Sequence, residues 1–166
     1  TDALSSQPSA VQERWTRALD HLENARVYDA YLEFNELLKM RLGPTLQTHV
    51  QLQAVRCLRD APVERSKTEL ALIDPQDAYQ TIVLDYRLGW LMRHRLMSVA
   101  AALQYFDRVR EEARRLGSRT WEIAALLEKA TALMAQGSYE QGIEVCMRVY
   151  NLSRRNGLVE YIPKAL

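Results

Sequence analysis

The stretch of sequence that decides the fold runs from Trp121 to Gly157 and reads WEIAALLEKATALMAQGSYEQGIEVCMRVYNLSRRNG. Its first half is largely apolar, and its second half places apolar and charged residues with the spacing of an amphipathic helix. Between the two halves, residues 135–139 read AQGSY, which is typical of a tight turn. Because a connection this short forces two helices to run antiparallel, the stretch predicts a helical hairpin.

The second half of this hairpin recurs earlier in the chain. Residues 102–117 align on residues 142–157 with an offset of forty residues. The residues that coincide under this offset include Arg108/Arg148, Val109/Val149, Arg114/Arg154, Arg115/Arg155 and Gly117/Gly157. Self-similarity at a fixed period is typical of an array of helical hairpins. We therefore expect several hairpins stacked one after another.

The rest of the chain also places its apolar residues with helical spacing. The predicted helices cover residues 9–25, 27–42, 46–58, 62–73, 79–93, 98–116, 120–136 and 138–157. We expect capping boxes at Ser9 and Ser138, a helix start at Asp74-Pro75 and a helix stop at Gly43. No segment shows the sustained alternation of a strand, so the predicted fold class is all-α, built from stacked antiparallel helical hairpins.

The repeat also predicts how the chain is divided. We expect residues 1–8 to be a flexible N-terminal segment and residues 9–166 to be a single helical domain. Under the same offset, Trp121 corresponds to Tyr161, so the chain is expected to stop inside the first helix of a further repeat. A repeat array cut there leaves an apolar helix face uncovered. We therefore expect the chain to self-associate or to pack its last helix back.

Composition narrows the classes of partner. The 22 basic and 21 acidic residues give a formal net charge of +1, so no global field draws the chain to a membrane or to nucleic acid. No apolar run approaches the roughly 18–20 residues that cross a bilayer. Cys57 and Cys146 lie far apart inside predicted helices, which indicates buried, reduced thiols and a cytoplasmic location.

The stretch from Leu126 to Val149 resembles a tetratricopeptide repeat. The turn glycine and the following aromatic residue of that family correspond to Gly137 and Tyr139. The small residues of the helix seams correspond to Gly142, Ala102, Ala30, Ala130 and Gly89, and the bulky residues to Cys146, Phe106 and Phe34. The period near forty is similar to the longer-helix variant of bacterial regulators. The resemblance implies a short right-handed solenoid that binds a protein or a peptide.

The resemblance further implies a groove lined by the first helix of each hairpin. The residues expected to bind a peptide or ligand there are Trp15, Tyr86, Trp90, Arg93, Leu127, Thr131 and Met134. A subset of the family grips a terminal carboxylate with Lys and Asn, but the matching positions here are Leu127 and Thr131. An apolar groove for a helix or an extended peptide fits these residues better.

The motifs of catalysis and of metal binding were not found in the sequence. It has no glycine-rich phosphate loop, no Cys-x-x-Cys and no His-Glu-x-x-His. The histidines His21, His49 and His94 are isolated from one another, and Cys146 occupies a packing position. Arg93, with its neighbours at the end of a predicted helix, is favoured there by the helix dipole. We expect no enzymatic activity, no cofactor and no metal.

The favoured hypothesis is a non-catalytic module for protein–protein interaction or oligomerisation within a larger regulatory or signalling protein. Its partner would be a protein or a peptide, with a homo-oligomer as a further possibility. The alternative is a ligand-sensing domain, in which a small molecule or a signalling peptide in the groove switches an attached output domain. The alternative requires polar groups that converge on a pocket, such as Arg93 beside Tyr86 and Trp90.

Overall fold

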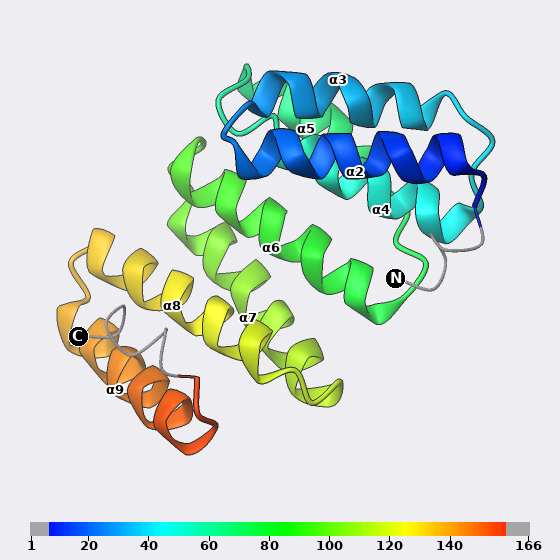
Figure 1. Cartoon of the computed structure of the whole chain (residues 1–166). Helices are drawn as coiled ribbons and strands as arrows, with labels where there is room; N and C mark the ends of the chain where they lie inside the picture. Colours follow the sequence, from blue (N-terminus) through cyan, green and yellow to red (C-terminus); the bar gives the residue numbers. More distant parts are fainter. Residues whose placement is uncertain (1–6, 159–166) are drawn as a thin grey trace. The chain divides into compact units, whose positions relative to one another are not determined.

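The computed structural model describes residues 7–158, and within that range all regular structure is helical (Figure 1). Within each unit, neighbouring helices pack against each other, which confirms the predicted all-α class of stacked hairpins. No helix in the described range is long and apolar enough to cross a membrane. The chain forms two compact units, Thr1–Gln80 and Thr81–Leu166, where the sequence analysis treated residues 9–166 as one domain.

The first unit holds four helices: α2 (Ser9–Glu23), α3 (Val27–Leu38), α4 (Pro44–Arg56) and α5 (Val63–Ala71). The second unit holds α6 (Ala78–His94), whose first turn belongs to the first unit, and then α7 (Val99–Arg115), α8 (Arg119–Ala135) and α9 (Tyr139–Arg155). Each predicted helix is therefore present. The predicted flexible segment 1–8 and the predicted further repeat beyond Leu158 lie mostly outside the described residues.

Several predicted helix ends are wrong. Ser9 lies inside α2 rather than before it, and Pro8 takes the N-cap position without a side-chain hydrogen bond. Ser138 is at the N-cap of α9, but its hydroxyl accepts from the Gln136 amide at 3.3 Å and caps nothing. Gly43 has an extended backbone and precedes Pro44, so it begins α4 instead of ending α3, which already stops at Leu38.

Asp77, not Asp74, caps α6. The Oδ1 atom of Asp77 accepts the backbone N–H of Gln80 at 2.7 Å, as in a capping box. Gln80 is 2% exposed, and both polar atoms of its side-chain amide have a hydrogen-bond partner. Its Oε1 accepts the N–H of Gln76 at 2.9 Å, and its Nε2 donates to the carbonyl of Thr45 at 2.9 Å. The start of α6 is thereby fixed to the first turn of α4.

The first unit has a core in which aromatic rings meet aliphatic side chains. Trp15 of α2 makes an edge-on contact with Phe34 of α3, with ring centroids 5.7 Å apart. Phe34 and Ala30 are fully buried. The buried members of this core are Val11, Ala18, Ala30, Tyr31, Phe34, Leu37, Leu46, Val50, Ala54 and Leu58. Tight packing of α2 on α3 agrees with the predicted first hairpin.

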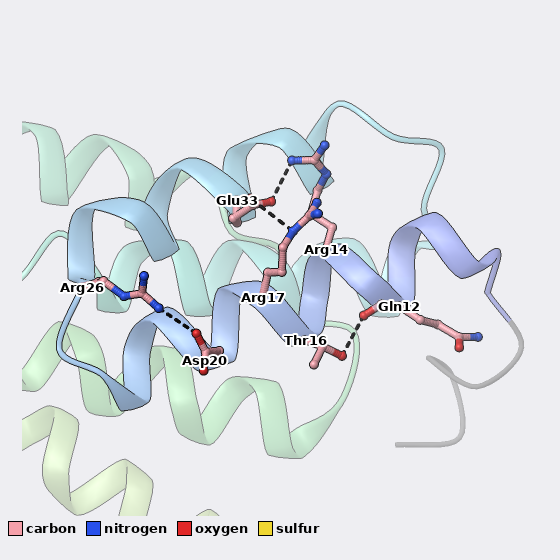
Figure 2. Close-up of polar contacts among 7 residues, drawn as sticks. All are labelled: Gln12, Arg14, Thr16, Arg17, Asp20, Arg26 and Glu33. Carbon is pink, nitrogen blue, oxygen red and sulfur yellow. Dashed lines mark hydrogen bonds and ion pairs between the residues drawn. The ribbon is translucent and has the colours of Figure 1, made fainter.

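Ion pairs hold the polar side of the same hairpin together (Figure 2). Arg14 and Arg17 of α2 both point to Glu33 of α3, at 2.7 Å and 3.5 Å. Arg26 pairs with Asp20 at 2.7 Å across the turn between the two helices. The Arg14–Glu33 pair is shielded, with 26% and 19% of the side chains exposed, so it contributes more than an open surface pair.

The forty-residue repeat is visible in the second unit. α9 begins and ends forty residues after α7, at Tyr139 and Arg155 against Val99 and Arg115. The buried positions of α7 are Ala102, Phe106, Val109 and Ala113. The buried positions of α9 are Gly142, Val149 and Ser153, each forty residues on, whereas Cys146 is half-buried. The two helices therefore use the same face in the same register.

Small residues allow the helices of each hairpin to approach closely, as the sequence analysis expected. A Cβ atom added to Gly89 of α6 would lie 2.8 Å from the ring of Phe106 and 3.0 Å from the Cβ of Tyr105 on α7. A Cβ atom added to Gly142 of α9 would lie 2.7 Å from the Cγ of Met134 on α8. In each hairpin of the second unit, the two helices thus meet at one glycine, where the facing helix carries a larger side chain.

These two glycines predict different sensitivities to alanine. Gly89→Ala drives a methyl group into the buried Phe106 ring and should lower the free energy of unfolding by about 1–3 kcal/mol. In Gly142→Ala the added methyl group lies 2.7 Å from the Cγ of Met134, a flexible side chain that can shift, and 3.3 Å from the Ala130 carbonyl oxygen, so this variant should lose less stability than Gly89→Ala. Urea unfolding of the two variants measures the difference. Equal losses would contradict the assigned contacts.

Left-handed residues end several helices. Gly117, Gly137 and Gly157 each follow a helix by two residues with positive φ. The next N–H then donates to the carbonyl five residues back, which is a Schellman motif. Ala25 takes this position after α2, with φ of 57°, and Arg26 N–H donates to the His21 carbonyl at 2.8 Å. An alanine therefore stands where the second unit has glycine.

Ala25→Gly should stabilise the first unit. A left-handed backbone places the alanine Cβ against the following carbonyl, and relief of that contact exceeds the entropy cost of glycine, so we expect a gain of about 0.5–1 kcal/mol. Ala10→Gly is the matched control, because Ala10 is an exposed residue within α2. It should cost about 1 kcal/mol. Thermal unfolding of both variants measures the sign, and a loss at both positions would refute the assignment.

Candidate functional site

The seven residues expected in the groove fall on the first helices of hairpins, as predicted. Trp15 lies on α2, in the first unit. The other six are divided between α6, which carries Tyr86, Trp90 and Arg93, and α8, which carries Leu127, Thr131 and Met134. Among these seven residues, Tyr86 and Arg93 meet at one carboxylate of α8, whereas Leu127 and Met134 lie against α9.

Trp15 forms part of the wall of the first core. Besides Phe34, its ring faces His49 of α4 with centroids 5.2 Å apart. Burial lowers the pKa of His49, and the charge of Asp77 opposes this shift. His49 is therefore neutral at pH 7 and presents a flat, uncharged ring to Trp15. The tryptophan is half-buried, so its outer part remains accessible.

Glu128 of α8 is the centre of the candidate site in the second unit. Its carboxylate accepts a hydrogen bond from the Tyr86 hydroxyl at 3.3 Å and forms an ion pair with the Arg93 guanidinium. The Nε2 atom of His94 lies 3.8 Å from the same carboxylate. We call these four residues the Glu128 cluster. It joins α6 and α8, the first helices of two successive hairpins.

The Glu128 cluster is largely shielded from water. Only 14% of the Arg93 side chain and 20% of the Glu128 side chain are exposed. The Tyr86 ring makes edge-on contacts with Phe106 and Trp121, with centroids 5.9 Å and 5.4 Å away. Burial raises the pKa of Tyr86 far above its ordinary value, and the Glu128 carboxylate raises it further. The hydroxyl therefore stays protonated and remains a donor.

Trp90 extends this face towards the C-terminal end of α6. Its ring stacks on the His94 ring, with centroids 4.5 Å apart and an interplanar angle of 23°. The two residues are one helical turn apart, so the stack lies along the side of the helix. Trp90 is half-buried and His94 is exposed. An aromatic surface thus adjoins the charged pair of Arg93 and Glu128.

The three predicted residues of α8 have different surroundings. Leu127 is half-buried and packs against a core that includes Val149 of α9. Met134 contacts the backbone position of Gly142, so its side chain is directed to α9. Thr131 is exposed, and its hydroxyl donates to the Leu127 carbonyl at 2.7 Å. Thr131 is therefore the member of this set best placed for contact with a partner.

Sequence reasoning missed Glu128 and the involvement of His94. The partners of Glu128 are 34–42 residues away in sequence, so no local pattern marks them. A usable signal was available in the repeat. Because α8 begins 41 residues after α6, Glu128 follows directly on Leu127, the counterpart of Tyr86. Glu128 thus lies one position beyond the counterpart of the residue whose hydroxyl it accepts.

A second surface of interest lies on α9. Tyr139, Ile143 and Met147 are 64%, 56% and 63% exposed and follow one another at intervals of four residues. A hollow of about 550 Å³ runs beside this helix and is lined, within the described chain, by α9 residues that include Glu144, Met147 and Arg148. We call Tyr139, Ile143 and Met147 the α9 stripe. We expected an uncovered apolar surface where the repeat array is cut, and the sequence pattern did not single out these three residues.

The thiols and potential metal ligands add little chemistry to these surfaces. Cys57 and Cys146 form no disulfide within the described residues and are half-buried, where buried thiols were expected. Burial raises the pKa of the Cys146 thiol, which keeps it protonated and unreactive near pH 7. Within residues 7–158, no three His, Cys, Asp or Glu side chains gather to hold a metal ion.

The Glu128 cluster predicts a clear stability difference. Glu128→Gln keeps the shape of the side chain but leaves the shielded Arg93 charge without its counter-ion. We expect the free energy of unfolding to fall by about 1–3 kcal/mol. Glu112→Gln is the control, because its partner Arg115 is 71% exposed and the pair should contribute less than about 0.5 kcal/mol. Urea unfolding compares them, and similar losses would contradict the role given to Glu128.

Comparison with known proteins assigns no family to this chain. No protein-family model matches it, and a search of the curated proteins found no match. The resemblance to the tetratricopeptide family therefore rests on the residues that suggested it, such as Gly137, Tyr139 and Gly142.

Proposed function

We propose that this chain is a non-catalytic protein-interaction module of a larger regulatory or signalling protein, and that it binds a peptide or a helix on the face shared by α6 and α8. The observation that carries the proposal is the Glu128 cluster. It holds Tyr86 and Arg93 of α6 at Glu128 of the following hairpin, and Trp90 stacks on His94, the fourth member of the cluster. Tyr, Trp and Arg are the residue types that contribute most to protein interfaces.

The chemistry of this face favours a partner with both apolar and acidic groups. The Trp90–His94 stack offers a flat surface for an apolar side chain. Arg93 and His94 supply two groups that can be positively charged, whereas Glu128 supplies one negative charge. The protonated Tyr86 hydroxyl and the exposed Thr131 add polar contacts. A short amphipathic segment with a carboxylate matches this combination.

A ligand-sensing role is a second candidate, supported by the same ion pair. Glu128 bridges two hairpins through Arg93 and Tyr86. A small anion that bound Arg93 in place of Glu128 would release this bridge and change the packing of α6 on α8. Ligand binding would then be coupled to a structural change. Calorimetry with small carboxylates tests this candidate, because binding of a small carboxylate in the absence of any peptide would favour ligand sensing.

Selection of binders from a library of helical and extended peptides tests the proposed function. Thr131→Arg adds a bulky charge at an exposed position of α8 that is expected to line the groove, and it should weaken the selected peptides by about tenfold or more, equivalent to about 1.4 kcal/mol. Thr68→Arg in α5 is the matched control, because Thr68 is also exposed and also donates its hydroxyl one turn back. It should leave the affinity unchanged.

The measurement is a fluorescence titration of each selected peptide against the unmodified chain and both variants. Selected peptides that bind the two threonine variants equally well would place the binding surface elsewhere. A selection that returns no binder from either class of peptide would argue against an interaction module of this kind.

A further inference from the structure

The α9 stripe is the repeat counterpart of a surface that already binds a helix. On α7, Asp107 pairs with Lys129 of α8 at 2.7 Å, and Arg114 pairs with Glu122 of α8 at 3.7 Å. These two pairs mark the face of α7 on which α8 lies. Forty residues on, the same face of α9 carries Met147 in place of Asp107 and retains an arginine, Arg154, in place of Arg114.

The counterpart face on α9 has become more apolar at its centre. Met147 replaces a carboxylate that pairs with α8, and Ile143 and Tyr139 continue the stripe towards the N-terminal end of the helix. Three large apolar side chains in one row, each more than half exposed, are typical of a contact surface in a soluble domain. The face is therefore suited to a helix whose own contact surface is apolar at its centre.

The charges at the two ends of the face identify that helix. The N-terminal end carries Glu140 beside Tyr139, and the C-terminal end carries Arg154, which lies over the Tyr150 ring at 5.6 Å. An antiparallel copy of α9, related by a two-fold axis near Met147, brings Glu140 of each copy to Arg154 of the other. A parallel copy would bring like charges together. The face is thus complementary to itself.

We propose that a second copy of this chain docks on the α9 stripe, so that two α9 helices pair antiparallel around Met147 in a two-fold dimer. This inference rests on the proposed role as an interaction module but uses a face other than the α6–α8 face. The interface is isologous, because each copy contributes the same residues. Pairing of one helix per copy buries an area at the low end of specific interfaces, so the dimer should dissociate in the micromolar range.

Sedimentation of the full chain over a range of micromolar concentrations tests the dimer. The mass should rise with concentration from 19.2 kDa towards twice that value. Met147→Lys should weaken the dimer by about tenfold or more, since it introduces two charges at the axis. Leu72→Lys is the matched control, because Leu72 is 68% exposed but belongs to the first unit, and it should leave the dimer unchanged.

Charge exchange tests the antiparallel geometry itself. Glu140→Arg and Arg154→Glu should each weaken self-association, because each creates two like-charge contacts in the dimer. A mixture of the two variants should form a mixed dimer, and the double variant should dimerise again, since opposite charges then meet. Circular dichroism checks that each variant is folded.

Three results would overturn the proposal. One is a full chain that stays monomeric at all concentrations. If such a chain dimerised only after removal of residues 159–166, that segment would be the occupant of the face and the proposal would also fail. Another is a dimer that is insensitive to Met147→Lys. The third is a failure of the mixed charge variants to associate. If the chain is monomeric but still binds peptides, the dimer proposal fails and the proposed function stands.

Discussion

In each hairpin of the second unit, the two helices approach most closely at a glycine of one helix, which faces a larger side chain of the other. At Gly89 the neighbouring helix supplies the Phe106 ring, and at Gly142 it supplies Met134. This close approach fixes the distance between the paired helices, and the buried Ala102 and Ala130 extend the same seam. Once the helices of each hairpin are this close, the residues on their outer sides have defined neighbours. The Glu128 cluster and the α9 stripe both depend on that constraint.

Polar contacts then join elements that the apolar seams have placed together. In the first unit, Glu33 receives two arginines of the partner helix. In the second unit, Glu128 connects two successive hairpins, and Asp107 with Lys129 connects α7 to α8. These pairs are shielded from water to different degrees, so they contribute differently to stability. The most shielded of them, Arg93–Glu128, lies in the candidate site. Structure and recognition therefore use the same residues on the α6–α8 face.

The two surfaces proposed for interaction differ in how the repeat produces them. The α6–α8 face arises from first helices of consecutive hairpins, and it combines aromatic rings with charged groups such as Arg93 and Glu128. The α9 stripe arises because the last described helix repeats a helix-binding face, with Met147 in the place of a carboxylate. A repeat array can therefore bind a foreign segment on one face and a copy of itself on another.

The sequence by itself determined the all-α class, the positions of the helices, the antiparallel hairpins and the forty-residue period. These properties follow from local spacing of apolar residues and from short turns, which adjacent residues encode. Only the tertiary structure decided that Asp77 caps α6, that Glu128 meets Tyr86 and Arg93, and that Met134 faces α9. Such contacts join residues on different turns or helices. The pattern of apolar residues along a helix shows which side of it is apolar, but it does not show which residues pack against that side.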